Sequence, residues 1–375
     1  MARYWLVENN REETYINYLK NLITRGELYK LVPEKIISSV INTEIGEDTL
    51  SEIFSDINEI NGNKKIDLII GGPPCQAYSL VGRSRDSKKM VGDKRNYLYK
   101  YYAKFLEKYQ PEYFLFENVL GLLSAKDESN NCYLDDMKKV FGDIGYTVET
   151  KKISAVDFGV LQNRERIILV GRLKGNALQY PEPEKWNPGR VCVREIFRDL
   201  PFLKSGKGKI GPCKTKKYDR SYLYDAGIKD DIFPVTLHQA RPNTEQDLEI
   251  YRLVVELWNK EKKRLDYNML PNYLKTHNNR DAFTDRFKVV AANLKYSHTV
   301  VAHIAKDGHY YIHPNIKQNR SITPREAARL QTFPDDFYFE TDSGIPGRSA
   351  AFRQIGNAVP VLMAERIAKK LLEVW

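Results

Sequence analysis

Short apolar runs alternate with amphipathic segments along the first half of the chain. Runs rich in aliphatic and aromatic residues predict strands at residues 3–7, 67–70, 113–116, 147–152 and 167–170. Apolar residues at helical spacing predict helices at residues 12–22, 98–109, 134–144 and 363–374. Strands that alternate with helices are typical of an α/β layer, so this pattern predicts a largely parallel sheet.

The pattern changes near Tyr180. Pro181, Pro183 and Pro188 interrupt the chain there, as in a linker. From this point to about residue 288 the sequence is basic, rich in Tyr and Asn, and only weakly periodic. We therefore expect a larger domain over residues 1–180, a smaller domain of loops and short elements over 181–345, and a C-terminal segment, 346–375, that packs back on the first domain.

Composition excludes several classes of protein. The chain has 375 residues, of which 42% are hydrophobic and 29% charged, as in an ordinary globular protein. No apolar run reaches the ~18 residues of a membrane span, and the first ten residues lack the apolar core of a signal peptide. The four cysteines are scattered and form no C-x-x-C pair, so we expect no disulfide framework, no structural zinc and a cytoplasmic location.

The charge balance is basic. Lys and Arg number 59 against 49 Asp and Glu, which gives a formal net charge of +10. Such a chain attracts polyanions, of which nucleic acids are the commonest. A basic surface can equally serve solubility, so charge alone leaves both readings open.

The strongest local motif is Gly71-Gly-Pro-Pro-Cys-Gln76, directly after the apolar run 67–70. Ligands of open α/β sheets bind beyond the carboxyl ends of the strands. Glycines there let the backbone approach a ligand, and prolines hold the loop rigid. Cys75 is therefore a candidate nucleophile, although most cysteines are buried structural residues, and we expect Cys132, Cys192 and Cys213 to be of that kind.

Two further motifs place charged residues at strand ends. Glu117 follows the apolar run 113–116, and an apolar wall favours a carboxyl group that keeps a proton for donation. Arg164 and Arg166 alternate at the start of the run 167–170, which would direct both to one side of a strand, suited to an anion or a polarised carbonyl. A surface glutamate and a surface salt-bridge ladder are the corresponding structural readings.

Taken together, five blocks in this order resemble the C5-cytosine-specific DNA methyltransferase family of bacterial restriction–modification systems. The blocks are the Pro-Cys loop around Cys75, the Glu117-Asn-Val119 segment, Gln162-x-Arg-x-Arg166, the arm 320–337, and Gln354-Ile-Gly-Asn-Ala-Val-Pro360. The resemblance implies a Rossmann-like S-adenosylmethionine-dependent methyltransferase sheet over residues 1–180 and a smaller target-recognition domain over 181–345.

The resemblance also implies a mechanism. The target cytosine is flipped out of duplex DNA, and the Cys75 thiolate adds to its C6. Glu117 meets N3 of the ring, while Arg164 and Arg166 lie near the ring carbonyl, with Arg166 the expected ring contact. S-adenosylmethionine supplies the methyl group for C5, and loss of the C5 proton with elimination of the thiolate completes the reaction.

Other residues take expected roles by the same resemblance. The methyl donor is expected to contact Glu8, Pro74, Leu98, Asn357 and Val359. The basic segment 77–96 is expected to close on DNA and clamp its phosphates, although a solvated charged loop would look the same. The DNA contacts expected around it are Gln76, Ser79, Arg83, Arg85 and Arg95.

One family block is not found. The family begins with a strand and a Phe-x-Gly-x-Gly turn that grips the cofactor, whereas here Tyr4-Trp-Leu-Val-Glu-Asn9 already resembles the second strand. We therefore expect the first strand of the family's sheet to be missing. Three explanations stay open: a truncated reading of a longer gene, a small subunit that supplies the block, or an inactive member.

Two functions consequently remain open from the sequence. The first is an active DNA (cytosine-5-)-methyltransferase, alone or with that small subunit, that acts on double-stranded DNA beside a cognate restriction endonuclease. The second is a DNA-binding protein that is catalytically impaired. Cys75, Glu117 and Arg166 favour the first, and the missing turn favours the second. An RNA methyltransferase with the same chemistry is a third possibility, which the basic insert before Thr323 makes less favoured than duplex DNA.

Overall fold

The computed structural model describes residues 1–73, 78, 97–175, 177–218, 221–278, 280, 284–341 and 343–375. Two compact units are present. The sheet unit comprises residues 33–154, 165–183 and 369–375, and the second unit comprises residues 1–32, 155–164 and 184–368. The boundary after Pro183 lies three residues from the predicted change at Tyr180. The observed units differ from the predicted division in that residues 1–32, 155–164 and 346–368 belong to the second unit.

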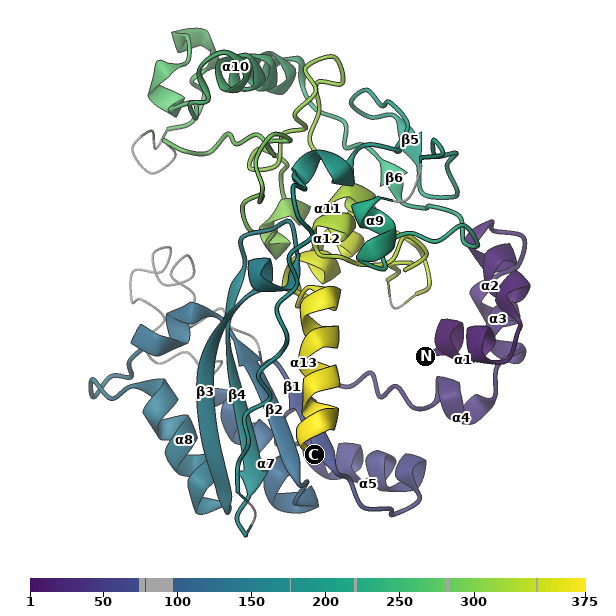
Figure 1. Cartoon of the computed structure of the whole chain (residues 1–375), viewed down its shortest axis with the longest axis vertical. Helices are drawn as coiled ribbons and strands as arrows, with labels where there is room; N and C mark the ends of the chain where they lie inside the picture. The colour runs from purple at the N-terminus through teal and green to yellow at the C-terminus, as the bar shows by residue number, and fades with distance from the viewer. Residues whose placement is uncertain are drawn as a thin grey trace. The chain divides into compact units, whose positions relative to one another are not determined.

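The sheet unit contains four strands in the order β1-β2-β4-β3 (Figure 1). Its elements are α4 (Glu34–Ile37), α5 (Leu50–Asn61), β1 (Leu68–Gly71), α7 (Tyr99–Tyr109), β2 (Tyr113–Asn118), α8 (Tyr133–Asp143), β3 (Tyr146–Ser154) and β4 (Glu165–Leu173). The four strands predicted between residues 67 and 170 are thus confirmed, as are the helices predicted at 98–109 and 134–144.

The sheet is mixed, which corrects the prediction of a largely parallel one. Among the described strands only the β1–β2 pairing is parallel, whereas β4 pairs antiparallel with both β2 and β3, so β4 alone runs against the other three. A helix, α7, connects β1 to β2 and allows the parallel crossover. Between β3 and β4 the chain has ten residues with only a short 3-10 helix, Ala155–Phe158, and the two strands pair as antiparallel neighbours.

The core of the sheet unit lies between β2, β4 and the helices α7 and α8. Phe114 and Phe116 of β2 are fully buried there and contact the Tyr102 ring edge-on. The Tyr102 hydroxyl lies 3.0 Å from the Ile69 carbonyl oxygen and 3.2 Å from that of Leu115. A Cβ on Gly71 would lie 2.5 Å from the same ring, so glycine is required where β1 ends. Tyr102 therefore fixes the ends of β1 and β2 together.

The N-terminal strand predicted at residues 3–7 is wrong. Residues Ala2–Glu8 form helix α1, with Leu6 buried, and α2 (Glu12–Leu19) and α3 (Arg25–Lys30) follow it. Tyr15 donates a hydrogen bond to the Asp336 carbonyl oxygen, and Arg3 pairs with the Asp336 carboxylate. These contacts are available only within the second unit, and Ala, Arg, Leu and Glu are good helix formers, so the segment forms a helix instead of a sheet strand.

The second unit consists mainly of loops and short elements, as predicted. Besides α1–α3 it contains β5 (Gly208–Lys209), α9 (Tyr222–Asp225), β6 (His238–Gln239), α10 (Glu245–Glu261), α11 (Pro324–Leu330) and α12 (Arg348–Asn357). Helix α13 (Val361–Val374) confirms the helix predicted at 363–374. One core lies between α10 and the segments around Tyr267, Phe287 and Ile312. None of the helices in the described ranges combines the length and apolar character that a membrane crossing requires.

Candidate active site

The parallel pairing of β1 and β2 brings two of the sequence motifs together. Gly71 lies opposite Phe116, so the next residues, Gly72 and Glu117, are neighbours at the carboxyl end of the sheet. A Cβ on Gly72 would lie 3.1 Å from Glu117 Oε2. Glycine at position 72 thus leaves room for the Glu117 carboxylate at the point where the chain leaves β1 toward Cys75.

Asn118 holds the start of this loop. Its side chain is almost fully buried, and Nδ2 donates to the Pro73 carbonyl oxygen at 3.5 Å, while Oδ1 accepts from the Val119 amide at 2.9 Å. The amide therefore ties the segment that precedes Pro74 and Cys75 to the end of β2, beside Glu117.

Glu117 forms an ion pair with Arg166. Glu117 and Ile168 are opposite each other in the β2–β4 register, and Arg166 Nε lies 2.6 Å from Glu117 Oε1. The side chains remain 12% and 19% exposed, so solvent or a ligand can reach the pair. Arg166 also donates to the Glu165 carbonyl oxygen at 2.8 Å, which fixes the guanidinium. A positioned carboxylate beside a guanidinium is suited to a planar ligand that carries both donors and acceptors.

Arg164 lies before β4 and not on it, contrary to the expectation that both arginines face one side of a strand. It precedes β4, belongs to the second unit, and is 1% exposed. Its guanidinium donates to the carbonyl oxygens of Val300 at 2.7 Å, Gly356 at 3.1 Å and Ala358 at 2.8 Å. Because a buried guanidinium needs such acceptors, Arg164 acts as a clamp on the backbone of the second unit.

Two buried glutamines extend that clamp, and sequence reasoning missed one of them. Gln162 donates to the Leu330 carbonyl oxygen at 2.9 Å and accepts from the Val300 amide at 2.8 Å. Gln331 donates to the carbonyl oxygens of Ile355 and Ala358. Gln162 and Arg164 thus meet parts of the blocks 320–337 and 354–360 in one buried polar network, and the only sequence signal for Gln331 is its place in the block 320–337.

A second set of buried charges surrounds α11, every residue of which is buried. Arg320 makes two bonds to the Glu326 carboxylate, at 2.7 and 2.8 Å. Arg329 pairs with Asp335 and Asp199. Burial would raise the pKa of Glu326, but the charges of Arg320 and His313 outweigh it and hold that pKa well below its usual range. These residues form the scaffold of the second unit.

The residues expected to bind the methyl donor fall on separate segments. Leu98 immediately precedes α7 in the sheet unit and is half-buried. Asn357 ends α12 and is exposed, and Val359 is half-buried; both belong to the second unit. Glu8 ends α1, is exposed, and raises the pKa of Tyr4 through a hydrogen bond. The site roles of these residues stay predictions.

The other predicted site residues lie outside the described residues. They are Pro74, Cys75, Gln76, Ser79, Arg83, Arg85 and Arg95. Within the described part, Cys132, Cys192 and Cys213 are free and half-buried, and burial raises the pKa of Cys213 to about 11, which fits an unreactive thiol. No group of three metal-binding side chains occurs among the residues that the structure describes.

The described residues at the ends of β1 and β2 form only part of a site for a methyl donor. Among the described residues β1 pairs with β2 alone, and Ile70 on β1 is 65% exposed, whereas Tyr113, Phe114 and Phe116 of β2 are fully buried. The described part of the sheet unit therefore supplies one wall of a site at the strand ends. We accordingly assign no cofactor contact to a described residue.

Comparison with known proteins decides the family. The family model for C-5 cytosine-specific DNA methylases matches residues 40–373. This chain belongs to the C-5 cytosine-specific DNA methylase family. It is accordingly an enzyme that methylates cytosine in DNA at C5, with S-adenosylmethionine as the methyl donor.

Curated relatives and a solved structure agree with this assignment. The chain is 40% identical to the Type II methyltransferase M.Bpa9945I of Bacillus paralicheniformis, over 92% of this chain and 81% of that protein. It is 30% identical to the Type II methyltransferase M.DdeI of Desulfomicrobium norvegicum, over 89% and 77%. A crystal structure of a prophage-encoded DNA modification methyltransferase from E. coli has a similar fold, with a TM-score of 0.58 and 22% identity over 88% of this chain and 83% of that chain.

Proposed function

We propose that Cys75 is the nucleophile of this enzyme and that it acts on a cytosine flipped out of the duplex. The observation that carries the proposal is the meeting of Gly72, Glu117 and Arg166 at the strand ends, where Gly72 lies three residues before Cys75 in the sequence. A base inside a duplex cannot reach such a site, so the target must leave the stack.

The proposed steps use each residue type for what it does best. The Cys75 thiolate forms a bond to C6, which moves an electron pair toward N3 and C5, and Glu117 stabilises the ring by a hydrogen bond at N3. Arg166 orients the Glu117 carboxylate through its Nε contact and lies beside the ring position. C5 then accepts the methyl group that S-adenosylmethionine supplies. Removal of the C5 proton by a base and departure of the thiolate from C6 restore the aromatic ring.

Substitution of the nucleophile tests this proposal. Cys75→Ser should lower methyl transfer to DNA more than about 1,000-fold, because a hydroxyl is a poor nucleophile and a poor leaving group here. DNA binding should persist, and Cys132→Ser, at the start of α8, is the matched control that should stay active. Turnover of Cys75→Ser near the wild-type rate would refute the assignment.

We further propose that the basic segment 77–96 contacts the DNA backbone and that the enzyme works in the cytoplasm within a restriction–modification system. The net charge of +10 and the six Lys and Arg residues of the segment support the DNA contact. The names of the two relatives above support the biological setting. Loss of protection of host DNA on deletion of the gene would test the setting.

The exposed β1 edge supports a small subunit as a further partner. A subunit that adds a strand beside β1 would cover Ile70 and could bring the glycine-rich cofactor turn that the sequence lacks. The same observation favours the second candidate function, a DNA-binding member with impaired turnover. Transfer of labelled methyl groups to DNA by the purified chain alone separates the cases: full turnover excludes both the required subunit and the impaired member.

A further inference from the structure

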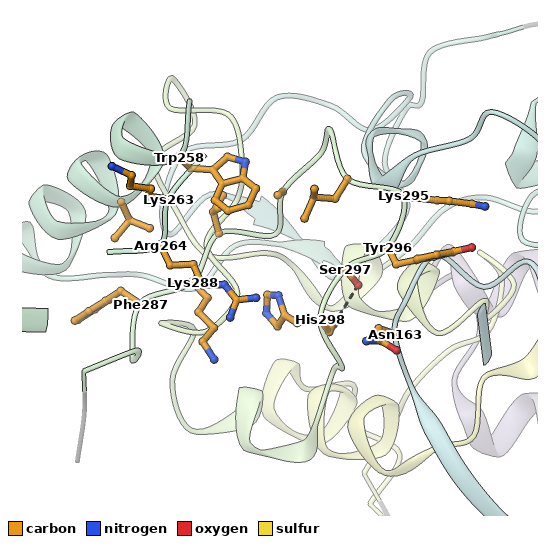
Figure 2. Close-up of a pocket in the computed structure, with 14 residues that line it drawn as sticks. Asn163, Trp258, Lys263, Arg264, Phe287, Lys288, Lys295, Tyr296, Ser297 and His298 are labelled. Carbon is orange, nitrogen blue, oxygen red and sulfur yellow. Dashed lines mark hydrogen bonds between the residues drawn. The ribbon is translucent and has the colours of Figure 1, made fainter. Parts of the chain in front are cut away.

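A cavity of about 370 Å³ lies within the second unit, and none of the residues named in the proposed mechanism lines it. It is lined by the C-terminal half of α10, residues 263–264 and 287–298, and Asn163. The rings of Trp258, Phe287 and Tyr296 contribute to its walls (Figure 2). This volume is near the lower end of the ~300–1,000 Å³ of ligand pockets, so it suits a small group and not a helix or strand.

The charges of this pocket are all of one sign. Lys263, Arg264, Lys288 and Lys295 line it, and no Asp or Glu of the described residues does. Arg264 has no acidic partner within the described ranges, and Figure 2 shows its guanidinium beside His298, with Lys288 close by.

The carboxylates that approach these cations lie outside the lining. Asp285 pairs with Lys288 and is 58% exposed, and Glu261 pairs with Lys263 and is 50% exposed. An ion pair whose carboxylate is this exposed contributes little to stability, so both lysines can also contact an anion in the pocket. The Lys288 ammonium also lies 4.9 Å from the centre of the Tyr310 ring, a cation–π contact that keeps it at the pocket.

The pKa of His298 is affected by the positive charges that line the pocket. Its Nε2 lies 2.5 Å from the Tyr310 carbonyl oxygen, which fixes Nε2–H as the donor. Burial lowers the pKa of His298 to about 4, and the charges of Lys288 and Arg264 act in the same direction. The ring is therefore neutral near pH 7, and the pocket offers its positive charge through Arg264 and Lys288.

We propose that this pocket binds a phosphodiester group of the DNA substrate, with Arg264 and Lys288 as its ligands. The inference rests on DNA as the substrate in the proposed function and adds a backbone contact outside the basic segment 77–96. A guanidinium forks around phosphate oxygens, and an ammonium beside it supplies a second charge. Because a backbone phosphate carries no sequence information, the pocket would position any duplex.

Binding to a duplex of random sequence, without methyl donor, tests the pocket independently of turnover and of Cys75. Arg264→Gln and Lys288→Gln in the full chain should each weaken binding several-fold and reduce the slope of log affinity against log salt by about 0.9, the value for one lost phosphate contact. The matched controls are Arg252→Gln and Lys260→Gln, at exposed positions of α10 that do not line the pocket. Equal thermal unfolding midpoints would establish that the variants fold.

The outcomes separate the alternatives. Affinities and salt slopes equal to those of the controls, or a wild-type chain that binds no duplex, would overturn the proposal. An unchanged salt slope with altered preference among sequences would assign the pocket to base recognition instead. Inorganic phosphate that binds the pocket equally well with and without saturating duplex would assign the pocket to free phosphate, because a DNA phosphodiester bound there would exclude it.

Discussion

Two Arg–Glu ion pairs in this enzyme have nearly equal nitrogen–oxygen distances but lie in different environments. Arg166 and Glu117 are 2.6 Å apart at the strand ends and 12% and 19% exposed, whereas Arg320 and Glu326 are 2.7 Å apart and at most 1% exposed. Glu326 is saturated by two bonds from Arg320 and one from the Thr323 amide. Glu117 Oε2 faces Gly72 and has no donor among the described residues.

The comparison shows that the same type of ion pair can either stabilise the core or bind a ligand. A buried pair whose oxygens are all bonded cannot accept a ligand, and removal of one partner leaves an uncompensated charge in the core. The Arg166–Glu117 pair is reached by solvent, and its Glu117 Oε2 has no donor among the described residues, so it contributes less to stability than the buried pair and can bind an incoming ring. We therefore expect substitutions at the two sites to separate activity from stability.

The strongest test of the difference between the two pairs is to neutralise each glutamate in turn. Glu117→Gln should lower methyl transfer by roughly 100- to 10,000-fold, the range for loss of a proton-handling group. Its free energy of unfolding should change by less than about 1 kcal/mol, because the pair is partly solvated. Steady-state methylation kinetics and urea unfolding on the same sample measure both quantities.

Glu326→Gln should show the reverse. It leaves the buried Arg320 guanidinium without its counter-charge and should lower the free energy of unfolding by about 3–5 kcal/mol. The folded fraction should keep a kcat within a few-fold of wild type, since Glu326 contacts none of the proposed catalytic residues. If Glu326→Gln lost activity while its free energy of unfolding stayed unchanged, the two pairs would not differ in the way proposed.

The sequence predicts the site of chemistry better than the scaffold that holds it. Gly72 and Glu117 follow apolar runs, and the carboxyl ends of parallel strands lie at one edge of a sheet, so the meeting of these two residues was predictable. Arg166 precedes its run and meets Glu117 because β4 is antiparallel to β2. That direction was not predictable, because a strand pattern carries no direction. Arg164 and Arg166 look equivalent as alternating residues, and only the start of β4 at Glu165 separates the clamp from the ion pair.

Buried charge was the feature least accessible from sequence. Arg320, Arg325 and Arg329 resemble surface arginines of an amphipathic helix until their partners, which come from distant segments, are known. The strand predicted at residues 3–7 failed for a related reason, since Leu6 is apolar enough for a strand but is buried in a helix whose contacts, such as that of Arg3 with Asp336, come from distant residues of the second unit.

The pH dependence of the free energy of unfolding tests the buried Arg320–Glu326 pair and its neighbour His313. Burial lowers the pKa of His313, which lies beside Glu326, from 6.5 to about 3, and the Arg320 charge acts in the same direction. His313 therefore takes up a proton near pH 6.5 in the unfolded chain but stays neutral at that pH in the folded chain. The stabilisation is fully present above that pH and is lost as the pH falls toward 3, by about 2 kcal/mol at pH 5.

Urea unfolding at pH 7 and pH 5 measures this effect. The drop between the two pH values should be smaller by about 2 kcal/mol in His313→Gln than in wild type. His277→Gln, at a half-buried position, is the control and should keep the wild-type drop. An identical drop in His313→Gln would show that other groups carry the acid sensitivity.

The smallest expected effect concerns the space beside Glu117. Gly72→Ala places a methyl group 3.1 Å from Glu117 Oε2, which must move by a few tenths of an ångström against its bond to Arg166. Misplacement of a catalytic group by up to 1 Å costs as much as 100-fold, so we expect a fall in kcat of about tenfold with unchanged stability. Ile60→Ala, at an exposed position of α5, should leave kcat unchanged.

The most direct test of the account is covalent capture at Cys75. A duplex pool whose cytosines are replaced by 5-fluorocytosine has no C5 proton to lose, so the enzyme supplied with S-adenosylmethionine should remain bonded to the DNA through denaturation. Peptide mapping should place the link at Cys75, and Cys75→Ser should give none. A folded sample that binds this DNA and the methyl donor yet forms no adduct, or forms one at another residue, would contradict the account.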